Sequence, residues 1–304
     1  MPSILQAIKE RPLLGDGAMG TQLMIAGLAQ GNCGEEWNLS HPERVLGIQR
    51  NYVNAGSDCL LTNTFGGSRI MLNRHGNADN VVPINRAAVE IARRAFDEAG
   101  REGFVIGDIG PFGGLMEPYG EFTEQQVREA FNEQAKALVD AGADAIIIET
   151  QTSLEELALG IEAAKEAGAP CIIGSLAYDV TLDGSTFRTM MGVDPERAAE
   201  FMAEAGAHIV ALNCGTGMDM PRARDAVERY KQATELPVMA QPNAGQPKLV
   251  EMKITYDESP EHMVQGVVPL LESGANIVGG CCGSTPDHIR LFRQAINEYL
   301  AARV

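Results

Sequence analysis

Residues 141–150 read Ala141-Gly142-Ala143-Asp144-Ala145-Ile146-Ile147-Ile148-Glu149-Thr150, and this stretch decides the fold. A glycine directly after a helical segment ends the helix in the left-handed conformation. The apolar run 145–149 that follows is typical of a parallel strand buried on both faces. The same pattern, a small residue, glycine and a small-polar pair, recurs at 55–58, 205–208 and 273–276. The sequence therefore predicts repeated units in which a helix leads through a tight turn into a buried strand.

Eight such apolar runs follow one another along the chain, and helical segments separate most of them. Strands that alternate with helices form βαβ units and a parallel sheet. Eight units favour a single (β/α)8 TIM barrel domain over residues 1–304; an open doubly wound sheet is the alternative. The expected strands are 13–16, 59–63, 105–109, 145–149, 171–176, 209–214, 238–243 and 277–282, and the clearest helices are 123–140, 154–167, 195–205, 221–233 and 286–301.

Composition and charge exclude several function classes. The formal net charge is -17, and a polyanion is repelled by phosphate backbones, so we expect no nucleic-acid partner. No apolar run approaches the roughly 20 residues needed to span a bilayer, and the N-terminus lacks a signal-peptide core. We therefore expect no membrane association and a cytoplasmic location. Thiols stay reduced there, so the 6 cysteines are candidates for metal binding or catalysis before disulfides.

The cysteines point to a metal site. Cys214 ends the sixth expected strand, and Cys281 and Cys282 end the eighth. Active sites of such barrels lie at the carboxyl ends of the strands, and alternate strands supply the same interior layer. Adjacent strand residues normally point to opposite faces, so Cys281 and Cys282 could reach one ion only where the pleat breaks.

Three thiolates suit zinc and leave a fourth coordination position open, as in catalytic zinc sites. Three buried cysteines, a vicinal disulfide at 281–282 and a phosphate-binding loop at 279–284 are the alternatives. Cys59 and Cys171 begin apolar runs and are expected to be buried small hydrophobes, and Cys33 has no obvious partner.

The glycine-rich loop 15–21 after the first strand predicts an amino-acid site. Its small residues, among them Gly17, Ala18 and Met19, let backbone N–H groups converge on an anion such as a carboxylate. Asp16 beside this loop and Glu149 at the end of the fourth strand could together hold an ammonium group. An ordinary glycine-rich turn with a capping aspartate is the alternative.

Six motifs of the chain belong together: Gly15-Asp16-Gly17-Ala18-Met19-Gly20-Thr21, Thr62-Asn63-Thr64-Phe65, Glu149-Thr150, Asn213-Cys214, Pro242-Asn243-Ala244-Gly245 and Gly279-Gly280-Cys281-Cys282-Gly283. In combination they resemble the homocysteine S-methyltransferase family. The resemblance extends from about residue 13 to residue 296 and is closest to the homocysteine-binding domain of cobalamin-dependent methionine synthase. Betaine- and S-methylmethionine-dependent enzymes are more distant relatives.

The resemblance implies a (β/α)8 barrel that holds Zn²⁺ through Cys214, Cys281 and Cys282. It implies binding of the acceptor amino acid, homocysteine, by the Asp16 loop and Glu149; we assign Asn63 and Asn213 to the same substrate site. The implied reaction is zinc-dependent methylation of the homocysteine thiolate to methionine.

The methyl donor is the open question. One barrel uses up 304 residues, so folate and cobalamin modules cannot also fit, and the chain is expected to be an excised module or a free-standing subunit. We favour methylcobalamin on a separate corrinoid protein or module as donor. S-methylmethionine, S-adenosylmethionine or a betaine is the alternative, and a non-catalytic zinc-binding subunit is another. An onium donor needs an aromatic cage, for which the candidates are Trp37, Tyr52, Phe65, Phe112, Tyr119 and Tyr256.

Overall fold

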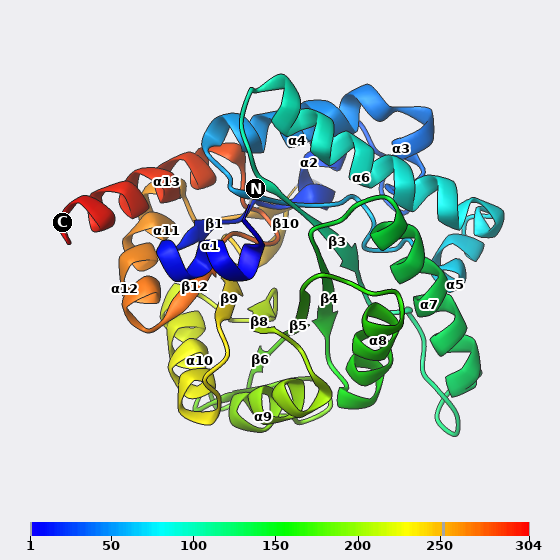
Figure 1. The fold of residues 1–304 in the computed structure, drawn as a ribbon. Coiled ribbons are helices and arrows are strands. Elements are labelled where there is room, and N and C mark those ends of the chain that lie inside the picture. The colour runs from blue at the N-terminus through cyan, green and yellow to red at the C-terminus, as the bar shows by residue number, and fades with distance from the viewer. Residues whose placement is uncertain (1, 251–252, 304) are drawn as a thin grey trace.

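The computed structural model describes residues 2–250 and 253–303. Eight parallel strands form one sheet that curves into a barrel (Figure 1), so the predicted (β/α)8 fold is confirmed. Around the barrel the strands run in the order β1 (Leu13–Leu14), β12 (Ala275–Val278), β9 (Val238–Gln241), β8 (Ile209–Asn213), β5 (Ile172–Leu176), β4 (Ala145–Gln151), β3 (Phe104–Ile109) and β2 (Cys59–Leu61).

Helices cover the outside of this barrel, and those predicted from the sequence begin and end within a residue of the expected positions. Within the described part of the chain, no helix is long and apolar enough to cross a membrane. The outer helices are α4 (Pro42–Ala55), α6 (Val81–Glu98), α7 (Glu124–Asp140), α8 (Leu154–Glu166), α9 (Pro195–Ala205), α10 (Met220–Ala233), α12 (Val267–Glu272) and α13 (Pro286–Ala301).

Four strands are shorter than the sequence predicts. β1, β2, β9 and β12 end two to four residues before the expected polar ends. At the end of β2, the peptide N–H of Leu61 donates to the Asp16 carboxylate at 2.8 Å, and the Thr62 N–H still donates to the Ile106 carbonyl of β3 at 2.9 Å. The polar residues thus lie in the loops just above the strands.

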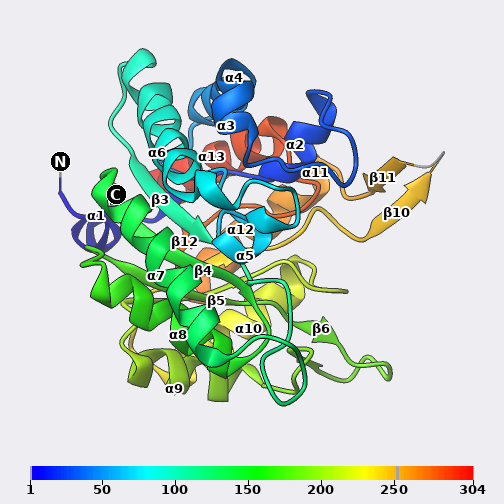
Figure 2. The same ribbon diagram turned by 90° about the vertical axis from the view of Figure 1, so that its right-hand side faces the viewer.

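Alternating side chains fill the barrel interior. Cys59, Leu61, Ile106 and Ile147 belong to one buried inner cluster, to which α1 (Ile4–Glu10) contributes Ile4 and other apolar side chains. α1 therefore closes the amino-terminal end of the barrel. Figure 2 shows α1 at one end, and at the other the hairpins β6 (Asp179–Val180)–β7 (Phe187–Arg188) and β10 (Pro247–Val250)–β11 (Lys253–Tyr256). The open mouth is at the carboxyl ends of the strands.

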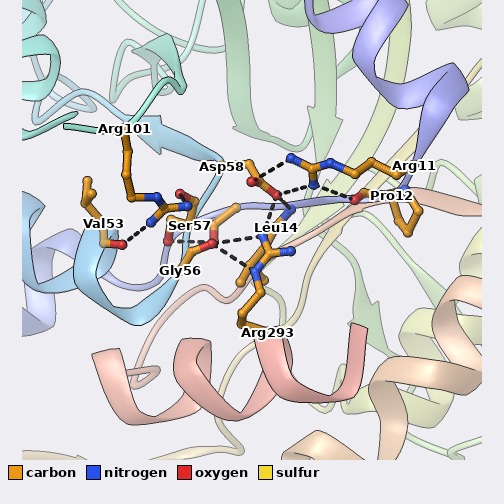
Figure 3. Close-up of polar contacts among 10 residues, drawn as sticks. Arg11, Pro12, Leu14, Val53, Gly56, Ser57, Asp58, Arg101 and Arg293 are labelled. Carbon is orange, nitrogen blue, oxygen red and sulfur yellow. Dashed lines mark hydrogen bonds and ion pairs between the residues drawn. The ribbon is translucent and has the colours of Figure 1, made fainter. Parts of the chain in front are cut away.

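A buried aspartate joins β1 to β2 where the barrel closes (Figure 3). The Asp58 N–H donates to the Leu14 carbonyl at 2.7 Å, and the Leu14 N–H returns a bond to the Asp58 carboxylate at 2.9 Å. Arg11 binds the same carboxylate through two nitrogens at 2.9 and 3.0 Å, and Arg293 of α13 pairs with it from the other side. Burial by itself raises the pKa of Asp58, but these partners outweigh it and hold the pKa below its ordinary value.

Asp58→Ala is expected to lower the free energy of unfolding by about 3 kcal/mol, because it leaves buried partners without their counter-charge. The folded pKa of Asp58 is depressed, so its contribution is present above the unfolded pKa of about 3.9 and is lost as pH falls through the folded value. Urea denaturation of wild type and variant from pH 7 down to pH 3 checks both statements. Asp140→Ala, which removes an exposed pair with Lys136, should change stability by less than about 0.5 kcal/mol.

Candidate functional site

A ring of polar side chains lies directly above the apolar core, and strand periodicity puts it there. Because side chains alternate between the two faces of a strand, the residue two positions after an inward apolar residue also points inward. Asp108 follows Ile106 in this way, and Glu149 follows Ile147, both of them core residues. The buried polar residues at these positions are Asn63, Asp108, Glu149, Ser175, Asn213 and Gln241.

A cavity of about 490 Å³ opens above this ring. It brings together most of the predicted site residues, although they come from five different strands or the loops after them. Asn213 does not line it. The predicted residues that line the cavity are Asp16, Gly17, Ala18, Met19, Asn63, Glu149, Cys214, Cys281 and Cys282.

Three of these residues, Cys214, Cys281 and Cys282, form a sulfur cluster. Their Sγ atoms all lie within 4.8 Å of one another, and Cys214 and Cys282 are 4.0 Å apart. All three are free thiols and only partly buried, so neither a vicinal disulfide nor ordinary core packing accounts for them. Among the described residues no further Cys, His, Asp or Glu joins the group. Three converging sulfurs fit a soft divalent cation such as zinc, with one position open.

Backbone geometry explains how adjacent residues reach one point. Cys214 has a φ of 56°, a left-handed conformation that is uncommon outside glycine, and this twist turns its side chain to the cavity directly after inward-facing Asn213. β12 ends at Val278, so Cys281 and Cys282 lie in a loop free of the strand pleat. Gly283 has a φ of 80°, and a Cβ there would lie 2.2 Å from Cγ of Tyr256, so only glycine fits.

Side-chain amides surround the sulfurs. Asn213 Nδ2 lies 3.8 Å from Cys281 Sγ, and Asn243 Nδ2 lies 3.7 Å from Cys214 Sγ. Hydrogen bonds from Cys281 and then Cys282 lower the pKa of Cys214, and the contact with Cys214 raises the pKa of Cys281 and of Cys282.

Asn213 connects the cluster to the neighbouring strands. Its Oδ1 accepts from the Ser175 hydroxyl at 2.6 Å and from the Thr150 N–H at 3.1 Å, and its Nδ2 donates to the Thr150 hydroxyl at 2.7 Å. Thr150, like Cys214, has a φ of 56°. These contacts explain why Asn213 faces protein rather than the cavity.

Two predicted carboxylates, Asp16 and Glu149, line the same cavity as the sulfur cluster. Burial raises the pKa of Asp16 to about 8, although the Leu61 N–H donates to it. Burial, and then the charges of Asp16 and Cys214, raises the pKa of Glu149 to about 8. A cationic group bound between them would relieve this penalty. The Ala18 N–H donates to the Ser284 hydroxyl at 3.1 Å, so an anion on this loop would use the N–H groups on either side.

Asp108 of β3 is a cavity-lining carboxylate that the sequence reasoning missed. Burial, followed by the charge of Glu149 and then of Asp16, raises its pKa well above the ordinary value. The signal was present in the sequence: it is the single charged residue in an apolar strand, on the inward face.

The remaining cysteines lie away from the cluster. Cys59 and Cys171 are buried in the inner core, as predicted. Cys33 does have a partner, since its thiol lies 3.4 Å from Glu35 Oε2, and both residues line the outer part of the cavity.

The six aromatic candidates do not converge. Among the described residues that line the cavity, Phe65 is the one aromatic side chain. Tyr119 is 85% exposed, and Tyr256 packs over the Cys282–Gly283 loop. Trp37, Tyr52 and Phe112 are buried elsewhere.

The chain is similar to known proteins in sequence and in structure. Methionine synthases of Mycobacterium tuberculosis and Mycobacterium leprae are 32% and 31% identical to the chain over 96% of its length. The chain spans 25% of the length of these relatives. The crystal structure of the metallated form of the homocysteine methyltransferase MmuM from Escherichia coli has a TM-score of 0.76 at 20% identity, covering 96% of this chain and 98% of that one.

A carboxyl transferase domain of Rhizobium etli pyruvate carboxylase shares the fold more loosely, with a TM-score of 0.53 at 15% identity over 96% of this chain and 48% of that one. Residues 13–296 match the family described as homocysteine S-methyltransferase, which is the same range over which the sequence motifs showed the resemblance. The chain belongs to the homocysteine S-methyltransferase family.

Proposed function

We propose that this chain catalyses zinc-dependent methylation of the thiol of homocysteine to methionine. The observation that carries the proposal is the presence of two kinds of group in one cavity: a cluster of three sulfurs and a set of buried carboxylates. A molecule with a thiol at one end and an α-ammonium group at the other satisfies both. Family membership supports the same acceptor.

The residues present fit a zinc ion. Cys214, Cys281 and Cys282 would hold it, because their sulfurs already lie close enough together to share one ion. When bound, zinc would supply a Lewis acid that keeps a coordinated thiol deprotonated at neutral pH, where a free thiol with pKa ~8.5 is mostly protonated. Asn213 and Asn243 point amide nitrogens at two of the sulfurs and would stabilise their negative charge.

The carboxylates of the same cavity would orient the acceptor. Asp16 and Glu149 would bind the α-ammonium group, and the N–H groups of Gly17 and Met19 would bind the α-carboxylate at the start of α2 (Met19–Ile25). With both ends held, the acceptor sulfur is presented to the donor in one orientation, which lowers the entropic cost of the reaction.

We favour a corrinoid carried by a partner protein or module as methyl donor, with methylcobalamin as its reactive form. A bulky donor needs an open mouth, and large apolar side chains are exposed in the loops there: Leu115 and Tyr119 after β3, Leu182 in the β6–β7 hairpin, and Met190 and Met191 after β7. Exposed apolar surface of this kind marks protein-binding sites. Phe65 is the one aromatic side chain among the described residues that line the cavity, and this argues against a cage for a small onium donor.

A donor panel tests this proposal. Protein, zinc and homocysteine are mixed separately with methylcobalamin, S-adenosylmethionine, S-methylmethionine or betaine, and methionine is measured. We expect methionine from methylcobalamin and none from S-adenosylmethionine. Methionine from the onium donors alone would overturn the corrinoid partner but keep the acceptor. No methionine from any donor, with zinc bound, would favour a non-catalytic zinc-binding subunit.

A further inference from the structure

Asp108 has a buried carboxylate oxygen without a partner. The residue is 4% exposed, it lines the cavity, and its Oδ1 atom has no hydrogen-bond partner among the described residues. The backbone around it is fully bonded, since the Asp108 N–H donates to the Thr62 hydroxyl at 3.0 Å and the Thr64 hydroxyl donates to the Asp108 carbonyl at 2.7 Å. Burying a charge without a partner is costly, so the position of this side chain points to a ligand.

The surroundings of Asp108 show what charge that ligand carries. Asp16 and Glu149 line the same cavity, and no Lys or Arg is among the described residues that do so. The protein donates one backbone N–H, from Leu61, to Asp16. Glu35 also lines the cavity, but its carboxylate already accepts from the Gly66 N–H at 2.7 Å. The carboxylates of Asp16, Asp108 and Glu149 therefore face a space whose described lining holds no Lys or Arg, and a cationic group is the ligand that such a space accepts.

We infer that Asp108 binds the α-ammonium group of the acceptor jointly with Asp16 and Glu149, and that the three carboxylates make the site selective for a primary ammonium. This inference rests on the proposed function and adds a residue and a selectivity rule to it. A primary ammonium has three N–H donors, one for each carboxylate. A secondary ammonium has two, so it would leave one buried carboxylate unpaired, and a deaminated thiol would leave all three unpaired.

Calorimetric titration tests the role of Asp108. Wild type and Asp108→Asn, purified under reducing conditions, are titrated with L-homocysteine and with 4-mercaptobutanoate, which lacks the amino group. Loss of one charge-assisted hydrogen bond should weaken homocysteine binding by about 10- to 100-fold. Binding of the deaminated thiol should be unchanged or tighter, because a negative charge has been removed. Asp144→Asn is the matched control: Asp144 precedes β4 at the far end of the barrel and should leave both affinities unchanged.

Two outcomes would overturn the inference. One is homocysteine binding to Asp108→Asn as tight as to wild type; the other is an equal loss for both ligands, which indicates a structural role. Should the variant fail to fold, wild type is titrated with N-methyl-L-homocysteine, which keeps the charge but has one N–H fewer. Equal affinity for the two amino acids would then refute the three-carboxylate site. The donor panel reports on the proposed function separately, because it scores methionine formation by wild type.

Discussion

Replacing Cys214, Cys281 or Cys282 with alanine, one at a time, will remove most of the zinc from the purified protein. Each variant leaves two of the three sulfurs that now lie within 4.8 Å of one another, and two sulfurs cannot complete a tetrahedral site. Loss of a surrounding hydrogen bond already costs about 10- to 100-fold in metal affinity, so loss of a ligand should cost more. Methionine formation should fall with the zinc content.

Elemental analysis measures zinc per chain, and X-ray absorption counts the sulfur neighbours of the ion. The matched control is Cys171→Ala, which removes a buried thiol from the inner core and should leave about one zinc per chain with three sulfurs. Fewer than three sulfur neighbours in wild type would contradict the assignment. So would full zinc content in any one of the three cluster variants.

The barrel was predictable because its signals are local. α7 ends at Asp140, the chain turns at Gly142, which has a φ of 92°, and the apolar run of β4 begins at Ala145. Each step of this pattern can be read from neighbouring residues, and the pattern recurs along the chain. The closure of the barrel was not predictable. Asp58 and Arg293 are 235 residues apart in the sequence and meet only once the ring of strands is complete. The residues next to each of them in the sequence do not indicate that they pair.

The site was predictable because active sites of such barrels lie at the carboxyl ends of the strands. Cys214, Cys281, Cys282, Asp16 and Glu149 all line the cavity, as their positions at strand ends suggested. The roles of particular side chains depend on details that alternation does not capture. Cys214 has a left-handed backbone, so its thiol joins the sulfur cluster although the preceding residue, Asn213, also faces inward. The Asn213 amide bonds to Ser175 and Thr150 instead of lining the cavity.

Asp108 shows the opposite case. Simple alternation from Phe104 and Ile106, both in the inner core, already places Asp108 inside the barrel. The sequence prediction used the last polar residue of each strand. It missed Asp108 because the apolar Ile109 and then Gly110 follow it. A charged residue inside an apolar strand is itself a signal of a site, since burial of an unpaired charge must be offset by a ligand.

Glu149→Gln is expected to weaken homocysteine binding and leave zinc in place. Glu149 and Glu156 are both buried, and burial raises the pKa of each, but only Glu149 lines the cavity. Glu156 accepts a hydrogen bond from the Phe112 N–H at 2.8 Å, a contact that glutamine can also make. Glu156→Gln therefore controls for replacing a buried carboxylate with an amide, and it should bind homocysteine as wild type does.

The size of the Glu149 effect follows from what the substitution removes. Glutamine has nearly the same shape, so the packing of this side chain inside the barrel is kept, while the negative charge that would face the ammonium is lost. Removing one partner of a buried charge pair costs about 2–5 kcal/mol of binding, which calorimetry resolves easily. The side chain contacts the acceptor and not the ion in our proposal, so zinc content measured on the same sample should stay near one per chain. Unchanged affinity for homocysteine would reject the role of Glu149, and loss of zinc together with affinity would place Glu149 with the sulfur cluster instead.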